Sequence, residues 1–284
     1  MKSVAVMGAT GAVGHEMLRT LERRNFPLSK IKLLASERSR GRKLEFNGEQ
    51  IAIEVLTEDS FGGVDIVLAS AGGDISKKFA PAAVRAGAVV VDNTSAFRMD
   101  PDVPLVVPEV NGEMVRKNKG IIANPNCSTI QMVIVLKPLH DAARVKRVIV
   151  STYQAVSGSG LRAIEELKNE TLAVLDGKTY ERSIFPHQIA FNCIPQIPQS
   201  DAFGPNGYTS EEMKMVNETK KILGDNSIRV TATTVRVPVV RGHSESVNVE
   251  TEKKLTADEA RRLLAAFPGV VVQDDPDNQL YPLA

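Results

Sequence analysis

Near its N-terminus the chain passes from a short apolar run into a cluster of small residues, and this passage constrains the fold more than any other feature. Residues 4–7 read as a buried strand, and residues 13–23 carry apolar side chains at helical spacing. The turn between them reads Gly8-Ala9-Thr10-Gly11-Ala12-Val13-Gly14. Small residues at a strand-to-helix turn let a pyrophosphate approach the backbone, where the helix N-terminus offers free N–H groups and a positive dipole end. We therefore favour a dinucleotide site, although the spacing GxxGxxG departs from GxGxxG and also suits a tight turn without ligand.

Strands and helices continue to alternate after this turn. Further strands are expected at 31–35, 64–69 and 88–92, with a helix at 76–86. This alternation predicts a Rossmann-type α/β domain with a doubly wound parallel sheet.

The pattern changes in the second half of the chain. Long β-branched segments at 145–154 and 227–239, an alternating stretch at 246–252, and helical stretches at 161–176 and 210–223 predict a mixed α+β domain. The Pro- and Asn-rich stretch 194–207 reads as a loop within it. We place the two domains at 1–126 and 127–284.

Composition excludes several classes of partner. The chain has 284 residues, 43% hydrophobic and 24% charged, which is typical of a folded protein of about two domains. A formal net charge of +1 leaves no excess to bind nucleic acid or an anionic membrane. The N-terminal apolar run is too short for a signal peptide or a spanning helix, so we expect a cytoplasmic protein.

The end of the second strand bears on the choice of nucleotide. It is followed by Ser36-Glu37-Arg38-Ser39-Arg40, where folds that prefer NAD commonly place an acidic residue for the ribose. Arginine and serine side chains suit a 2′-phosphate and favour NADP. Glu37 keeps NAD open, and solvated surface charge is the alternative to any ligand.

The candidate nucleophile lies at a second strand-to-helix turn. Asn124-Pro125-Asn126-Cys127-Ser128-Thr129 follows an apolar strand at 120–123 and precedes an apolar helical run at 130–136. A helix N-terminus favours the reactive thiolate over the thiol. An inert buried cysteine is the alternative, and Cys193, the other cysteine, lacks such a context and reads as structural.

A thiolate mechanism also needs a base. Of the four histidines, His243 lies in a glycine-flanked turn between two β segments and is a better candidate than His15, His140 or His187. A structural role for His243 stays open.

Four separated motifs together resemble the aspartate-semialdehyde dehydrogenase family. They are residues 8–14, residues 124–129, Tyr153-Gln154-Ala155-Val156-Ser157-Gly158, and Val235-Arg236-Val237-Pro238-Val239 followed by Gly242-His243-Ser244. The resemblance runs over essentially the whole chain, in order and at the family's spacing.

The resemblance implies a role for each motif. Cys127 would be the nucleophile, His243 the acid and base, and Gln154 a residue that orients the substrate; Asn126 is a candidate oxyanion donor. Arg236 would bind the α-carboxylate, Glu211 the substrate amine, and Arg98 and Lys214 the phosphate. Without the resemblance, Arg98, Glu211 and Lys214 read as surface charge. The implied NADP contacts are Gly8, Thr10, Gly11, Ala12, Val13, Ser36, Arg38, Ser39, Ala71, Ser157 and Gly158, and no metal is implied.

The implied reaction is the conversion of L-aspartyl 4-phosphate to L-aspartate 4-semialdehyde through a cysteine thioester, with NADPH as reductant. It serves the biosynthesis of lysine, diaminopimelate, methionine, threonine and isoleucine, in a homodimer joined by the second domain. Alternatives are a related acyl-phosphate reductase, such as N-acetylglutamyl-phosphate reductase, a relative of glyceraldehyde-3-phosphate dehydrogenase, or a non-catalytic NADP-binding subunit. The family usually continues past residues 280–284 with strands and a final helix, so we expect a chain of this length to be less stable and poorly active.

Overall fold

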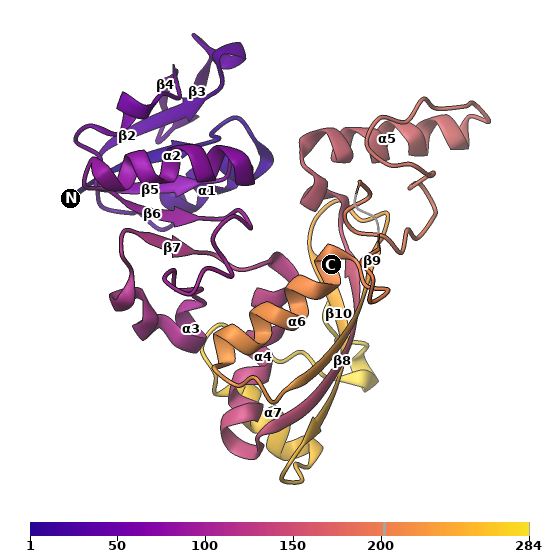
Figure 1. Cartoon of the computed structure of the whole chain (residues 1–284). Coiled ribbons are helices and arrows are strands. Elements are labelled where there is room, and N and C mark those ends of the chain that lie inside the picture. The colour runs from indigo at the N-terminus through magenta and orange to yellow at the C-terminus, as the bar shows by residue number, and fades with distance from the viewer. Residues whose placement is uncertain (201–202, 284) are drawn as a thin grey trace. The chain divides into compact units, whose positions relative to one another are not determined.

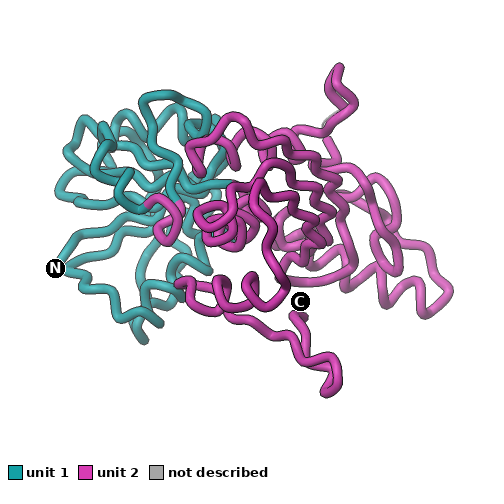
Figure 2. The backbone as a smooth tube through the Cα atoms, turned by 90° about the horizontal axis from the view of Figure 1, so that it is seen from below, with its two compact units in different colours: residues 1–106, 112–125 teal, residues 107–111, 126–284 magenta. Residues whose placement is uncertain are grey.

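The computed structural model describes residues 1–200 and 203–283 (Figure 1). The chain forms two compact units (Figure 2). Unit 1 comprises residues 1–106 and 112–125, and unit 2 comprises residues 107–111 and 126–284. The N-terminal half therefore contributes a short segment, 107–111, to the second unit. Within the described part, no helix is long and apolar enough to span a membrane.

Unit 1 is built on a seven-stranded sheet with the strand order β3-β4-β2-β1-β5-β6-β7. Every neighbouring pair is parallel except the edge pair β3–β4. The elements are β1 (Lys2–Met7), α1 (Ala12–Arg23), β2 (Leu28–Ala35), η1 (Glu37–Ser39), β3 (Lys43–Phe46), β4 (Glu49–Val55), η2 (Glu58–Phe61), β5 (Ile66–Ala69), α2 (Gly73–Arg85), β6 (Val89–Asp92), η3 (Gly112–Lys117) and β7 (Ile121–Ala123).

Alternate residues of the central strands bury opposite faces of this sheet. Val6 and Leu33 pack with Leu18 of α1, whereas Met7 and Leu34 share a second core cluster with Phe79 of α2. Helices thus cover both faces, which confirms the doubly wound architecture. Because these strands are parallel, the loops that follow β1, β2, β5, β6 and β7 all leave the sheet at the same end, where the carboxyl ends of the strands lie.

Unit 2 contains a three-stranded mixed sheet of order β10-β8-β9, in which β8 is parallel to β9 and antiparallel to β10. This confirms the expected α+β character. Its elements are α3 (Pro108–Asn111), α4 (Cys127–Ala143), β8 (Val145–Gln154), η4 (Val156–Ser159), α5 (Leu161–Leu175), α6 (Ser210–Leu223), β9 (Arg229–Arg236), β10 (His243–Thr251), α7 (Ala257–Ala265) and η5 (Pro276–Asn278).

Helices α4, α6 and α7 cover one face of the unit 2 sheet (Figure 1). Val148 and Val150 of β8 point toward them and are fully buried. Their alternate neighbours point the other way, and Ile149 and Tyr153 are 39% and 46% exposed. We call these the inner and outer faces of the sheet.

The structure extends and corrects several expected elements. The loop expectation for 194–207 holds for its described part, and residues 201–202 lie outside the described residues. The β3–β4 hairpin was not expected, although its Asn47-Gly48 turn, with φ of +49° and +79°, is a strong hairpin signal. Helix α7 was also missed, despite the capping box formed by Thr256 and Glu259. The placement of His243 in a turn was wrong, because the turn ends at Gly242 and His243 is the first residue of β10.

Candidate active site

Three of the candidate residues form one row across the inner face of the unit 2 sheet. His243 of β10 pairs with Gln154 of β8, and Gln154 pairs with Arg236 of β9. Residues directly opposite on neighbouring strands point to the same side, so the three side chains project together. Gln154 and Arg236 are 1% and 3% exposed. Strand register therefore brings Gln154 together with two residues that follow it by more than eighty positions in the chain.

The peptide of Ala155 ties the two ends of this row together. Its N–H donates to Nδ1 of His243 at 3.0 Å, and its carbonyl oxygen accepts from Nη1 of Arg236 at 2.6 Å. Because Nδ1 accepts a hydrogen bond, the proton of the neutral imidazole is assigned to Nε2. Burial lowers the pKa of His243, the charge of Arg236 lowers it further, and a hydrogen bond with Gly242 and the charge of Glu211 oppose this in part. The imidazole is therefore largely neutral at pH 7 and able to accept a proton.

Cys127 is the first residue of α4 and is exposed. Asn126 caps this helix, because its Oδ1 accepts from the backbone N–H groups of Ser128 and Thr129 at 3.0 and 3.2 Å. The N-terminus of a 17-residue helix favours an anion at this position. The thiol thus lies where the sequence placed it, at a helix start that stabilises a thiolate.

Helix α6 fixes the start of α4 through two carboxylates. Glu218 accepts from the backbone N–H of Asn126 at 2.6 Å, and Glu211 accepts from its Nδ2 at 2.8 Å. Asn126 itself is 5% exposed. Its contacts are those of a helix cap and an anchor to α6, so its role as an oxyanion donor stays a prediction.

Glu211 stands beside the row and remains ionised. It accepts from Nε2 of Gln154 at 3.2 Å and pairs with Nζ of Lys214 at 3.1 Å. Burial raises the pKa of Glu211, but the charge of Lys214 and the hydrogen bonds from Asn126 and Gln154 outweigh it, so the pKa lies below its ordinary value. A negative charge is therefore held next to the positive charge of Arg236. Glu211 and Lys214, which read as surface charge without the resemblance, lie within this cluster.

Arg236 has unused bonding capacity inside the site. Its Nε is buried with no hydrogen-bond partner in the described part of the chain, as is Oε1 of Gln154. Burial lowers the pKa of Arg236, opposed by the charges of Glu211 and Cys127, yet a guanidinium stays charged at neutral pH. A Cβ on Gly158 would lie 3.0 Å from Nη1 of Arg236, so a glycine leaves room for this side chain. Buried groups of this kind are usually satisfied by a bound polar molecule.

In unit 1 the loop after β1 fits a dinucleotide phosphate. Gly8 has a φ of +90°, and a Cβ there would lie 3.0 Å from backbone atoms of Ala71, which places the loops after β1 and β5 side by side. A Cβ on Gly14 would lie 2.4 Å from the carbonyl oxygen of Gly8, so only glycine permits this helix start. No side chain caps α1. Its first N–H groups, at Ala12 and Val13, are consequently available to an anion.

The expected NADP contacts in the loop after β2 differ in their exposure to solvent. Ser36 and Arg38 are exposed, but Ser39 is buried at 6% exposure. Glu37 pairs with Arg40 at 3.0 Å, whereas Arg38 makes no ion pair with any described residue. Arg38 and Ser36 are thus the residues here with side chains accessible to a phosphate.

Arg98, also in unit 1, holds two loops together. Its Nε donates to the carbonyl oxygen of Asn124 and its Nη2 to that of Asn93, both at 2.9 Å. The nearby loop is fixed by Asp92, which is fully buried and accepts from Ser76 and Thr94. Arg98 is 8% exposed, so its expected contact with phosphate stays a prediction.

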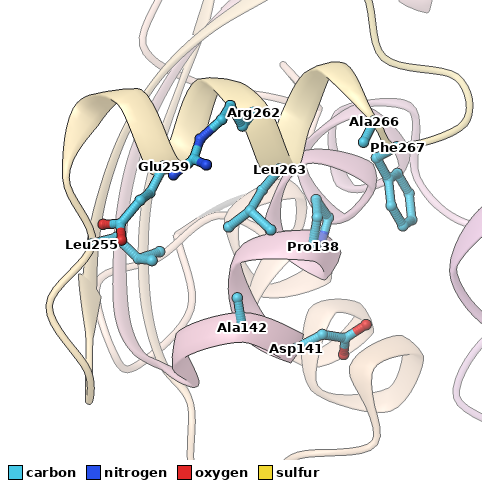
Figure 3. A pocket seen from close by; sticks show the side chains of 9 residues that line it. All are labelled: Pro138, Asp141, Ala142, Leu255, Glu259, Arg262, Leu263, Ala266 and Phe267. Atoms are coloured by element: carbon cyan, nitrogen blue, oxygen red, sulfur yellow. The ribbon is translucent and has the colours of Figure 1, made fainter.

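A separate hollow of about 690 Å³ lies between α4 and α7 (Figure 3). Apolar side chains such as Pro138, Leu263 and Phe267 line it, with Glu259 and Arg262 among its polar residues. It contains none of the candidate site residues. No group of three or more His, Cys, Asp or Glu side chains among the described residues is placed to hold a metal ion.

Comparison with known proteins gives a family for both parts of the chain. Residues 3–118 match the semialdehyde dehydrogenase NAD-binding domain, and residues 136–284 match the semialdehyde dehydrogenase dimerisation domain. An aspartate-semialdehyde dehydrogenase of Aquifex aeolicus is 57% identical over 284 residues, which are 99% of this chain and 83% of that protein. The chain belongs to the aspartate-semialdehyde dehydrogenase family. Another member, from Bacillus subtilis, is 53% identical over 99% of this chain and 82% of its own length.

Solved structures of aspartate-semialdehyde dehydrogenases share the fold. The crystal structure of aspartate semialdehyde dehydrogenase II from Vibrio cholerae complexed with ASA has a TM-score of 0.92 and 52% identity, over 95% of this chain and 80% of that one. The enzyme from Candida albicans, crystallised with NADP, has a TM-score of 0.72 and 26% identity, over 94% and 77% of the two chains. The N-terminal part of the present chain is accordingly an NAD(P)-binding domain, and its C-terminal part is a dimerisation domain.

Proposed function

We propose that the protein catalyses the NADP-dependent reductive dephosphorylation of L-aspartyl 4-phosphate to L-aspartate 4-semialdehyde, and the reverse reaction. The observation that carries this proposal is the row His243, Gln154 and Arg236, with Glu211 hydrogen-bonded to Gln154. It joins a base, an amide and two opposite buried charges in one cluster.

The charges of the cluster match those of the substrate. Arg236 presents a guanidinium for the α-carboxylate, and Glu211 presents a carboxylate for the ammonium group. Lys214, paired with Glu211, and Arg98 in unit 1 are the proposed cations for phosphate. Without a substrate, Arg236 and Glu211 already stabilise one another electrostatically, which keeps both charged and preorganised.

The proposed chemistry begins at Cys127. Its thiol proton passes to the neutral His243, and the thiolate attacks the acyl carbon of the substrate, so that a thioester forms and phosphate leaves. NADPH, when bound, supplies the hydride that reduces the thioester. His243 then returns its proton to the sulfur as the carbon–sulfur bond breaks, which releases the aldehyde and regenerates the thiol. Gln154 orients the acyl group, and N–H groups at the start of α4 are the proposed oxyanion donors.

Turnover of two aldehydes decides the substrate class. We expect phosphate-dependent NADP reduction to be at least about a hundredfold faster with L-aspartate 4-semialdehyde than with N-acetyl-L-glutamate 5-semialdehyde, because an acetylated amine offers no positive charge to the Glu211 carboxylate. Steady-state kcat/KM for both aldehydes, measured on one preparation, provides the comparison. Preference for the acetylated aldehyde would replace the proposal with the related reductase.

Preference for NADP rests on the loop after β2. Arg38→Ala is expected to raise the Kd for NADP about tenfold while leaving that for NAD within about twofold, because only NADP carries the 2′-phosphate. Titration of cofactor fluorescence or calorimetry measures both constants, and Arg40→Ala, which removes an arginine already paired with Glu37, serves as the control. Equal losses for the two cofactors would contradict the assignment of Arg38.

Four further features belong to the proposal. The contacts expected at Ser157 and Gly158 with the nicotinamide stay predictions, as do the domain limits 1–126 and 127–284 and a cytoplasmic location. We propose a homodimer, supported by the match to a dimerisation domain and by the apolar side chains of Ile149 and Tyr153 on the outer face of the sheet.

A further inference from the structure

A second row of polar residues lies directly behind the first on the inner face of the unit 2 sheet. Two positions along each strand, Glu245 of β10 pairs with Thr152 of β8, and Thr152 pairs with Thr234 of β9. Side chains alternate along a strand, so this row points the same way as His243, Gln154 and Arg236. The row after it, Val247, Val150 and Ala232, belongs to the hydrophobic core. Glu245 therefore lies between the candidate active site and the core, where an unpaired acid is costly.

Helix α4 holds Glu245 in this place through Gln131, whose side chain forms a hydrogen bond with it. Gln131 follows Cys127 by four residues and so lies on the same face of α4, with about 6 Å between the two Cβ atoms. His243 and Glu245 are two residues apart on β10, roughly 7 Å along the strand. Because these spacings match, the contact of Gln131 with Glu245 leads us to expect Cys127 and His243 side by side one step nearer the surface of the site.

No cation neutralises Glu245 within the described part of the chain. The elements with most contacts to β10 are β8 and α4, and α7 shares a core cluster with Val247 and Val249 of β10. From β8 it faces the uncharged Thr152, whose Oγ1 is buried without a partner, and its own Oε1 is also unpartnered. Burial raises the pKa of Glu245 to about 7, and the hydrogen bond from Gln131 opposes only part of this rise. Its carboxyl therefore changes charge near neutral pH.

Of the other charged groups nearby, Arg236 on β9 and Glu211 on α6 act on His243, whereas Cys127 at the start of α4 acts on Arg236. Further along α4, Lys137 is already paired with Asp141 at 2.6 Å. The titratable neighbour of Glu245 on its own strand face is thus His243.

We propose that Glu245 is a positioning residue of this site, whose carboxyl, held behind His243 by Gln131, governs whether the imidazole keeps a proton at neutral pH. An ionised carboxylate roughly 7 Å away favours the imidazolium, and a protonated carboxyl does not. The two groups then titrate as a coupled pair that shares one proton through the neutral range. For its use in catalysis this inference rests on the proposed function, but the coupling itself is a property of the folded chain.

The decisive variant is Glu245→Gln, which keeps the shape of the side chain and removes its charge. We expect the titration midpoint of His243, followed by NMR of ring-labelled protein without substrate, to fall by about one pH unit. Gln131→Leu weakens the ionised form of Glu245 and is expected to move the midpoint in the same direction by less. Glu250→Gln, on the exposed outer face of the same strand, is the matched control and is expected to leave the midpoint in place.

Turnover then shows whether the coupling serves catalysis. The limb of the kcat/KM pH profile that reports His243 is expected to shift with the NMR midpoint, while the KM for the aldehyde is unchanged. An unchanged His243 midpoint in Glu245→Gln, or in Gln131→Leu if the first variant does not fold, would overturn the inference and leave Glu245 a packing residue. A shifted midpoint in a protein that turns over no aldehyde would instead refute the proposed function and retain the coupling.

Discussion

Cys127→Ala is expected to abolish phosphate-dependent reduction of NADP by L-aspartate 4-semialdehyde, with a fall in kcat of at least about a thousandfold. Alanine removes the only atom that forms the thioester, and no other residue of the row His243, Gln154 and Arg236 supplies a comparable nucleophile. Binding of NADP should be retained, because the proposed contacts with its phosphates belong to unit 1 and Cys127 to unit 2.

Cys193→Ala is the matched control, since both cysteines are exposed in this structure. Cys193 precedes Ile194, which pairs with Arg236 in an isolated bridge, and has no helix N-terminus beside it. We expect kcat to stay within about twofold in this variant. Alkylation by iodoacetamide at pH 7, read residue by residue by mass spectrometry, should label Cys127 about tenfold faster than Cys193. Equal labelling, or full turnover in Cys127→Ala, would remove Cys127 from the mechanism.

Glu166→Ala is expected to lower the free energy of unfolding by about 3 kcal/mol. Glu166 of α5 is 2% exposed and accepts from the backbone N–H groups of Ser183, Ile184 and Phe185 at 2.7 to 2.9 Å. The segment 183–185 forms no helix or strand, so the carboxylate of Glu166 accepts the hydrogen bonds of its backbone N–H groups. Alanine leaves these three donors without that acceptor. Urea denaturation measures the loss, and hydrogen exchange of the three amides locates it.

The pH dependence of this loss follows from the same contacts. Burial raises the pKa of Glu166, but the hydrogen bonds from Phe185, Ser183 and Ile184 outweigh it and hold the pKa below its ordinary value. A lowered folded-state pKa gives stability that is present above the unfolded-state pKa and lost as pH falls through the folded one. The difference between the wild-type protein and the variant should therefore be complete at pH 7 and shrink below about pH 4.

Glu165→Gln is the control for this experiment, because Glu165 is the exposed neighbour of Glu166 on the same helix. Its free energy of unfolding should lie within about 0.5 kcal/mol of the wild-type value. A Glu166→Ala protein as stable as this control would show that the 183–185 segment is held by its apolar contacts alone. Those contacts are real, since Phe185 packs in a core cluster with Ile164 and Leu167.

Local patterns in the sequence determined most of the elements and the nature of the chemistry. Apolar spacing predicted β8 and α6 with the bounds that the structure gives them, and small residues around Gly8 and Gly14 predicted the turn that a Cβ would block. Such features depend on neighbours along the chain, so a sequence is sufficient to show them. The sequence analysis left out α7, although its Thr256–Glu259 capping box and its apolar positions Ala260 and Leu263 are local signals of a helix.

Only the tertiary structure decided which residues lie together. The sequence placed His243 in a turn, and strand register instead puts it at the start of β10, opposite Gln154 and in line with Arg236. Glu211 and Asn126 meet across two helices, and Glu245 gains its raised pKa from burial that no local pattern reveals. The physical reason is that charge states and hydrogen bonds of buried groups depend on solvent exclusion and on partners from distant strands and helices. Local propensity carries no information about solvent exclusion or about partners that are distant in the chain.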